Sequence, residues 1–329
     1  MIATTTLEAS GQESVTWFTH MLKNYIGFGF LEGYVSYMAY PLWLLVPFIL
    51  CNAVYLGVFC SLYICSFLFY IYKKKNNIQE DTTSKLWDNA KQIIANFMDT
   101  VGKIWHGYEV IGMEHLPEGP GLIVYYHGAL VLDYSLLVAR VYMQKGRHIQ
   151  SLVDNGLYIF PGTKLALDLT GCTNGNKSKC VEILKKGNLL GISPGGLREG
   201  NFSDHQNYNL IWGNRTGFAQ VALEAKVPII PMFSQNIREA LRTVGKTWWL
   251  RWLYDNYMRI LVLPIYGGFP VKLRTYLGEP IPYDPNITAT ELAGKTKIAI
   301  ENLRDRYQKK PGNILRALSE RFDKHHKDN

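Results

Sequence analysis

The longest uncharged stretch of the chain lies between Glu32 and Lys73, and its densest apolar part covers residues 42–72. About 20 helical residues cross the ~30 Å hydrocarbon core of a bilayer, so this stretch is long enough to span a membrane once. A shallow hairpin that turns near residues 52–57 is one alternative, and a buried core helix is another. We predict a membrane segment over residues 41–73.

The charges at the two ends of this segment predict its orientation. Lys73, Lys74 and Lys75 close it, whereas the start of the chain is polar and acidic and lacks the basic region of a signal peptide. Because positive charge favours the cytoplasmic side of a membrane, we expect the residues after it to lie in the cytosol. The expected organisation is a polar tail with an interfacial helix, a membrane segment, a connecting helix and a globular domain with a basic C-terminal helix, over residues 1–40, 41–73, 74–105 and 106–329.

Composition excludes several classes of protein. The chain has 329 residues, a formal net charge of +8, 47% apolar residues and 19% charged residues. This balance excludes a disordered or fibrous protein. The modest positive charge, together with the membrane segment, argues against nucleic acid as a partner. Five cysteines without regular spacing support neither a disulfide framework nor a metal site, so we expect no bound metal.

Strand-like and helical segments alternate after the membrane segment. Short apolar stretches predict strands, and apolar residues at three- and four-residue steps predict helices. The expected strands are residues 108–111, 121–126, 188–193, 228–233 and 271–277, and the expected helices are residues 81–105, 177–186, 217–225, 289–307 and 314–327. This alternation is typical of an α/β fold with a mixed, largely parallel sheet flanked by helices.

The first candidate site follows the expected strand at residues 121–126. His127 leaves the end of this strand beside Gly128, and Asp133 lies six positions after the histidine. A carboxylate that orients an imidazole leaves the other ring nitrogen free to take a hydroxyl proton, as a general base must. The structural alternative is that Asp133 caps the next helix and His127 is a hydrogen-bonded core residue.

A second candidate site follows the expected strand at residues 188–193. Adjacent glycines can turn their N–H groups toward an oxyanion, and an arginine can bind an anionic part of a substrate. The alternative is a tight turn with a surface ion pair. The candidate binding residues here are Pro194, Gly195, Gly196, Arg198 and Glu199.

Residues 191–195 also match the G-x-S-x-G pattern of serine esterases, with Ser193 as the nucleophile. In that pattern the residue after the serine donates its backbone N–H to the oxyanion. Here this residue is Pro194, which has no N–H. The pattern therefore argues weakly for a hydrolase.

Together with Val227-Pro228-Ile229-Ile230-Pro231, these two motifs resemble in order and spacing the glycerolipid acyltransferase superfamily. Its members carry a His–Asp block, a Phe-Pro-Glu-Gly block and a Val-Pro-Ile-Ile-Pro block. Residues 106–285 resemble still more a branch of endoplasmic-reticulum enzymes that acylate mono- and diacylglycerol to triacylglycerol. The stretches that carry this likeness are residues 105–109, 126–128, 192–196, 217–221 and 267–278. The resemblance implies the superfamily's α/β fold.

The chain departs from the wider superfamily in three ways. Five residues instead of four separate the histidine from the aspartate, and the Phe-Pro-Glu-Gly block has become Ser-Pro-Gly-Gly. Moreover, no arginine follows residues 156–160, where glycerol-phosphate enzymes usually carry one. The loss of this phosphate partner favours a neutral acceptor hydroxyl. The Pro-Gly-Gly-x-x-Glu pattern is also similar to the diacylglycerol and monoacylglycerol acyltransferase family.

The resemblance implies a mechanism. His127 takes the proton of a glycerol hydroxyl, Asp133 orients the imidazole, and the amides of Gly195 and Gly196 hold the oxyanion. Arg198 is expected to bind the acyl donor with support from Glu199. We expect no bound cofactor, with acyl-CoA or a phospholipid as the donor and diacylglycerol or monoacylglycerol as the acceptor.

Three other functions remain open from the sequence. A lysophospholipid or glycerol-phosphate acyltransferase needs a phosphate-binding cation, for which Lys164 is the available candidate. A serine lipase needs Ser193 as its nucleophile. A non-catalytic lipid-binding regulator needs neither.

Overall fold

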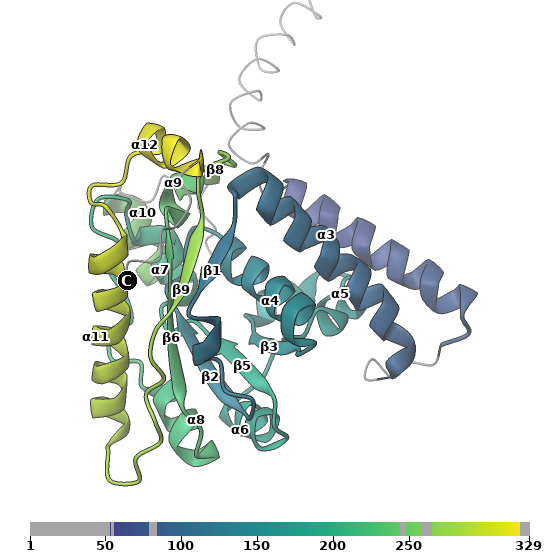
Figure 1. Cartoon of the computed structure of the whole chain (residues 1–329), viewed down its shortest axis with the longest axis horizontal. Coiled ribbons are helices and arrows are strands. Elements are labelled where there is room, and N and C mark those ends of the chain that lie inside the picture. The colour runs from purple at the N-terminus through teal and green to yellow at the C-terminus, as the bar shows by residue number, and fades with distance from the viewer. Residues whose placement is uncertain (1–52, 54–55, 79–83, 244–247, 258–264, 323–329) are drawn as a thin grey trace, which may run out of the picture. The chain divides into compact units, whose positions relative to one another are not determined.

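The computed structural model describes residues 53, 56–78, 84–243, 248–257 and 265–322. The predicted tail and interfacial helix at residues 1–40 lie outside this part of the chain, as does the first part of the predicted membrane segment. Within it, a seven-stranded sheet carries helices on both faces (Figure 1). The strands of this sheet are β1 (Glu109–Ile111), β2 (Gly121–Tyr125), β3 (Ile149–Leu152), β4 (Cys172–Thr173), β5 (Leu189–Ile192), β6 (Ile229–Gln235) and β9 (Arg274–Leu277).

The sheet is mixed and largely parallel, which confirms the predicted fold class. The strand order is β1-β9-β6-β2-β5-β3-β4, and of the paired strands in this sheet only β6 and β9 run antiparallel. The central strand β2 pairs in parallel with β5 on one side and with β6 on the other. The carboxyl ends of these three strands therefore meet at one edge of the sheet, where ligands bind in open α/β folds.

Helices cover the sheet in two layers because successive side chains of a strand point to opposite faces. Leu122 and Val124 of β2 join the core cluster that contains residues of α8 and α11, whereas Ile123 and Tyr125 join the cluster that contains residues of α4. Figure 1 shows α11 on one side of the sheet and α3 and α4 on the other. The helices are α3 (Asp88–His106), α4 (Leu132–Lys145), α5 (Lys164–Leu169), α6 (Lys177–Lys185), α7 (Gly196–Phe202), α8 (Gly217–Ala225), α9 (Ile237–Ala240), α10 (Trp248–Asn256), α11 (Ala289–Tyr307) and α12 (Ile314–Ser319).

Four short 3₁₀ helices and a small second sheet complete the described elements. The 3₁₀ helices are η1 (Lys85–Trp87), η2 (Met113–His115), η3 (Asn155–Ile159) and η4 (Glu320–Phe322). The second sheet pairs β7 (Leu241–Thr243) with β8 (Ile265–Gly267) in antiparallel fashion.

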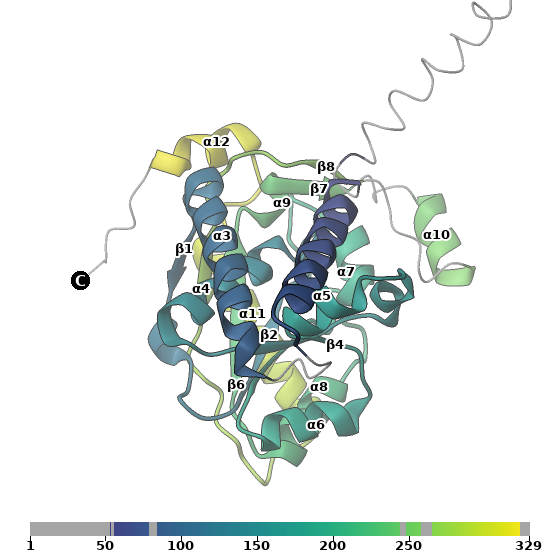
Figure 2. The ribbon, with the colours of Figure 1, turned by 90° about the vertical axis from the view of Figure 1, so that its right-hand side faces the viewer.

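Within the described part of the chain, one helix, Leu56–Lys75, is long and apolar enough to cross a membrane, with a mean hydropathy of 1.6 (purple in Figures 1 and 2). Its Phe69 packs edge-on against Trp87, with ring centroids 6.0 Å apart. Most of the helix surface is free, since Ile64 and Phe67 are 59% and 63% exposed. The predicted membrane segment is thus supported over its second part by length, composition and exposure.

The α3 helix exposes apolar residues of its own. Ile93, Phe97 and Ile104, at steps of four and seven residues, all lie on the exposed surface, whereas Ala90 and Ala95 are buried. The periodicity therefore predicts the helix correctly, but these large side chains do not form core contacts.

The predicted element bounds differ in accuracy. Helices α8 and α11 match their predicted bounds, while the C-terminal helix predicted for residues 314–327 is described only as α12 and η4. The strands β3 and β4 were not predicted, because β3 carries Gln150 and Ser151 and β4 has two residues.

Candidate functional site

Three loops meet at the carboxyl edge of the sheet. The loop after β2 carries His127, the loop after β5 leads through Pro194 and Gly195 into α7, and the turn after β6 leads into α9 with Arg238. The two parallel pairings bring these loops together: Val124 pairs with Ile192, and Tyr125 with Met232. The sequence motifs thus come from adjacent strands.

His127 is held by its neighbour in the sequence. Its Nδ1 lies 2.7 Å from the carbonyl oxygen of Gly128. A carbonyl only accepts hydrogen bonds, so Nδ1 carries the proton and Nε2 keeps a free lone pair. Burial lowers the pKa of His127 to about 4, and the nearby Arg238 guanidinium contributes in the same direction. The imidazole is therefore neutral near pH 7, as a general base must be.

Asp133 lies in the first turn of α4 and is 2% exposed. The residue at the helix N-cap is Val131, without a side-chain cap, so the alternative of Asp133 as an N-cap is wrong. Among the described residues no hydrogen bond joins the Asp133 carboxylate to the His127 ring, and Asp133 Oδ1 has no partner. Burial raises the pKa of Asp133 to about 6, although the Ser234 hydroxyl opposes this shift. Its proposed orienting role remains a prediction.

Glu199 ties the loop after β2 to the loop after β5. It is fully buried, and its Oε1 accepts the backbone N–H of His127 at 2.8 Å. Its Oε2 accepts the N–H of Ile211 at 2.6 Å. Burial raises the pKa of Glu199 to about 7. The alternative of a surface ion pair is wrong for this residue, because its carboxylate accepts hydrogen bonds from backbone amides inside the protein.

Arg198 lies apart from this carboxylate. Its Nη2 lies 3.5 Å from Oδ1 of Asp255 in α10, and its side chain is one-third exposed. Its Nε is buried and has no hydrogen-bond partner in the described part of the chain. The guanidinium of Arg198 thus lies near the surface. The carboxylate of Glu199 contacts the loop that carries His127 and does not contact Arg198.

The Pro194-Gly195-Gly196 turn is anchored by an arginine that sequence reasoning missed. Arg215 Nη1 donates to the carbonyl oxygens of Pro194 at 2.8 Å and Gly195 at 3.1 Å. Gly195 is the N-cap of α7 and Gly196 its first residue, with φ +52°, which favours glycine. The amides at this end have no acceptor within the helix.

Gly200 brings α7 against the histidine. A methyl carbon placed on Gly200 would lie 2.8 Å from His127 Nδ1 and 3.0 Å from the Gly128 carbonyl oxygen, which is too close for either. Sequence reasoning missed this residue, although its position directly after Glu199 was a usable signal. The close approach places the His127 ring against the second half of α7.

Arg238 was also missed, although a charged residue shortly after the apolar strand β6 is an unusual feature. It is 1% exposed, and its Nη2 donates to the carbonyl oxygen of His127 at 3.0 Å. Four of the predicted residues thus lie around one edge of the sheet, namely His127, Gly128, Gly195 and Glu199. Three residues that were not predicted lie at the same edge, namely Gly200, Arg215 and Arg238.

Two other chemistries have little support in the site. The Ser193 Oγ is buried and has no hydrogen-bond partner among the described residues, so no base is in place to activate it. The described residues contain no group of three or more His, Cys, Asp or Glu side chains that is suited to a metal ion.

Sequence comparisons identify the family. Residues 107–235 match the acyltransferase family model. The chain is 48% identical to the mouse (Mus musculus) protein "DGAT1/2-independent enzyme synthesizing storage lipids" over 97% of each chain. It is 49% identical to the human (Homo sapiens) protein of the same name over 95% of this chain and 97% of that protein.

The solved 1-acyl-sn-glycerophosphate (LPA) acyltransferase PlsC from Thermotoga maritima aligns with a TM-score of 0.42 and 14% identity, over 74% of this chain and 97% of that chain. The family assignment rests on the sequence relatives. These relatives share almost their whole length with the chain, and the matched family model covers both site motifs up to the end of β6. The chain belongs to the acyltransferase family, together with the relatives that carry the name "DGAT1/2-independent enzyme synthesizing storage lipids".

Proposed function

We propose that the chain is a membrane-bound O-acyltransferase that transfers a fatty acyl chain to the free hydroxyl of diacylglycerol, and also of monoacylglycerol, and so makes triacylglycerol. The similar mouse and human proteins are named for the synthesis of storage lipids, which supports a neutral glyceride as the acceptor. The apolar helix Leu56–Lys75 and the three lysines at its end support a membrane location with the catalytic domain in the cytosol. The endoplasmic reticulum is proposed from the resemblance to the acyltransferase branch.

The observation that carries the proposal is the hydrogen bond from His127 Nδ1 to the Gly128 carbonyl oxygen at 2.7 Å. It leaves Nε2 unprotonated and free to accept a proton. The low pKa of His127 keeps it in this form at neutral pH. An unprotonated ring nitrogen without a hydrogen-bond partner is what a general base needs to accept a hydroxyl proton, while a pKa nearer the operating pH would make it a stronger base.

The proposed reaction is a direct acyl transfer. Nε2 of His127 takes the hydroxyl proton as the glycerol oxygen attacks the acyl carbonyl carbon. A new C–O bond forms, and the carbonyl oxygen becomes an oxyanion near the amides of Gly195 and Gly196. One such amide is typically worth roughly 10²–10³ in rate. When the C–S or C–O bond to the donor breaks, the imidazolium returns its proton to the leaving group.

The donor is acyl-CoA or a phospholipid, and the mechanism uses no bound cofactor. Arg198 is the proposed contact for an anionic part of the donor. It is one-third exposed and its ion pair with Asp255 spans 3.5 Å. An exposed pair of this kind is weak enough to be exchanged for a substrate anion. Asp133, in the first turn of α4, is the proposed carboxylate that orients the imidazole of His127 and stabilises the imidazolium that forms.

The test is an acyl-transfer assay with detergent-purified protein in liposomes. Labelled diacylglycerol, monoacylglycerol and lysophosphatidate are offered as separate acceptors, with acyl-CoA and phosphatidylcholine as separate donors. Wild type is compared with His127→Ala, His127→Gln and Ser193→Ala, and the melting temperature Tm of each is recorded. We expect triacylglycerol from wild type and Ser193→Ala, and a loss of at least ~10² in both folded His127 variants.

The alternatives predict other results. A serine lipase releases free fatty acid and loses activity with Ser193→Ala. A lysophospholipid acyltransferase acylates lysophosphatidate in preference to diacylglycerol. Equal acyl transfer by wild type and a folded His127 variant would overturn the general-base role.

A further inference from the structure

The most deeply buried cation near the site is the guanidinium of Arg238, which emerges from the turn after β6. Its side chain is 1% exposed, although burying a charge without partners costs several kcal/mol. The structure supplies four acceptors. Nε donates to the Tyr126 hydroxyl at 2.8 Å, Nη1 to the Gly200 carbonyl oxygen at 2.7 Å, and Nη2 to the carbonyl oxygens of Glu199 and His127 at 2.7 and 3.0 Å.

These acceptors have a common arrangement. Tyr126 and His127 belong to the loop after β2, whereas Glu199 and Gly200 belong to α7 after β5. None of the four acceptor atoms is a carboxylate oxygen. The arginine is therefore not half of a conventional ion pair. Because the guanidinium is planar and presents its donors in a fixed fork, it sets the distance and the angle between the two loops.

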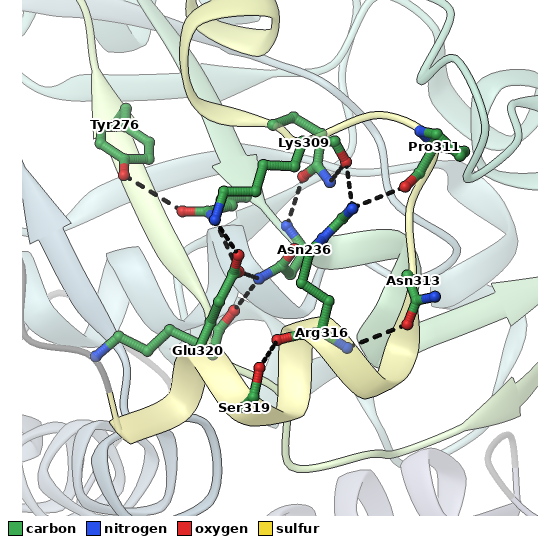
Figure 3. Close-up of polar contacts among 11 residues, drawn as sticks. Asn236, Tyr276, Lys309, Pro311, Asn313, Arg316, Ser319 and Glu320 are labelled. Carbon is green, nitrogen blue, oxygen red and sulfur yellow. Dashed lines mark hydrogen bonds and ion pairs between the residues drawn. The ribbon is translucent and has the colours of Figure 1, made fainter.

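The backbone turn that carries Arg238 is also held by hydrogen bonds. Asn236, at φ +64°, lies between β6 and α9, and its N–H donates to Gln308 Oε1 at 2.8 Å. Its Nδ2 donates to the Lys272 carbonyl oxygen and to Glu320 Oε2, each at 3.0 Å. Figure 3 shows Asn236 between Lys309 and Glu320, so the C-terminal segment fixes the turn that presents Arg238.

We propose that Arg238 is a positioning residue for His127. It holds the backbone of the histidine loop against α7, so that Nε2 points at the acceptor hydroxyl. This inference rests on the proposed general-base role of His127. A displacement of about 1 Å in such a base costs roughly 10²-fold in rate, even when substrate still binds.

A purely structural arginine would behave differently. It would lower stability when replaced, and activity would fall only as the folded fraction falls. A matched control is available in Arg140 of α4, which is also buried, at 7% exposed, and pairs with Asp99 and the Tyr108 carbonyl oxygen. Replacing either arginine with lysine keeps the charge and removes the planar fork.

The experiment measures kcat, KM for the acyl donor and Tm for wild type, Arg238→Lys, Arg140→Lys and His127→Ala in the liposome assay. We expect Arg238→Lys to lose roughly 10²-fold in kcat with KM within about 2-fold of wild type. Arg140→Lys should keep wild-type kcat at a similar Tm. If Arg238→Lys does not fold, Tyr126→Phe removes one acceptor with little change of shape and should lower kcat by roughly 3- to 10-fold.

The outcomes separate the inference from the proposed function. Equal kcat losses for Arg238→Lys and Arg140→Lys at equal Tm, with His127→Ala inactive, would overturn the positioning role alone. Unchanged kcat in Tyr126→Phe would do the same if the lysine variant is not obtained. Full activity of a folded His127→Ala would overturn the general-base role on which the inference depends.

Discussion

The backbone N–H of His127 points at the Glu199 carboxylate, 2.8 Å away, although the two residues are 72 positions apart in the chain. A second backbone donor, the N–H of Ile211, reaches the other carboxylate oxygen. Glu199 thus supports the candidate base through its backbone and leaves the imidazole ring free. The glutamate of the Pro-Gly-Gly-x-x-Glu pattern therefore serves the geometry of the loop.

Replacing Glu199 with alanine should destabilise the protein and slow acyl transfer. The change leaves the N–H groups of His127 and Ile211 without acceptors in a buried place, and each such loss costs roughly 1–3 kcal/mol. Tm and kcat of Glu199→Ala are the measurements. Glu182→Ala is the control, because Glu182 is 61% exposed and pairs with Lys186 on the surface. Equal Tm values for the two variants would contradict this account.

The pH dependence of stability should contain two opposed contributions. The pKa of His127 falls from 6.5 to about 4 on folding, so its contribution is present above pH 6.5 and is lost as the pH falls toward 4. The pKa of Glu199 rises from 4.5 to about 7, so its contribution is present below pH 4.5 and is lost as the pH rises through 7. Between pH 6.5 and 4.5 the two offset one another.

Variants should separate these contributions. Relative to wild type, His127→Gln should gain roughly 2 kcal/mol of stability between pH 6.5 and 5, and Glu199→Gln should lose a similar amount. Tm at both pH values tests this. Parallel curves for wild type and both variants would show that neither group titrates differently in the folded protein.

Adding a single methyl group at Gly200 should impair catalysis. The new carbon would lie 2.8 Å from His127 Nδ1, so the ring must move. We expect Gly200→Ala to lower kcat by roughly 10²-fold while KM for the acyl donor changes little. Gly294→Ala is the matched control, since it lies in α11 with open space around it and should be neutral or slightly stabilising. A wild-type kcat for Gly200→Ala would show that the His127 ring does not lie against Gly200.

Loss of the Glu320 carboxylate should loosen the turn before α9. Glu320 accepts from Asn236 Nδ2 at 3.0 Å and from Lys309 Nζ at 2.9 Å, and it is 4% exposed. Glu320→Ala should cost roughly 1–3 kcal/mol of stability and lower kcat more than Tm alone explains. Glu279→Ala, with its side chain 86% exposed, is the surface control. A Glu320 variant with wild-type kcat and Tm would exclude a role for this contact.

Local pattern predicted the elements that local chemistry specifies. The α11 helix matches its predicted bounds because Thr288 and Glu291 form a capping box at its start. In the same way, the apolar stretches of β2 and β6 predict buried strands, and their parallel pairing makes the loops after them neighbours.

What the sequence did not predict depends on contacts across the chain. Nothing in the residues around Glu199 shows that its carboxylate turns inward to backbone amides. Arg238 reaches the His127 carbonyl oxygen from 111 positions away, so no spacing rule connects them. Asp133 is the opposite case, because its short sequence distance to His127 suggests a contact, yet among the described residues no hydrogen bond joins the two side chains, and its orienting role stays a prediction.

The anchoring of the β6 turn by Glu320 has a consequence for how the enzyme matures. The contacts of Asn236 with Gln308 and Glu320 close loops of 72 and 84 residues, and closing such loops costs chain entropy. The geometry of the candidate site therefore depends on residues near the C-terminal end of the domain, and it is complete only when that segment is in place. Partly folded molecules should lack activity altogether, so acyl transfer reports on completion of the fold.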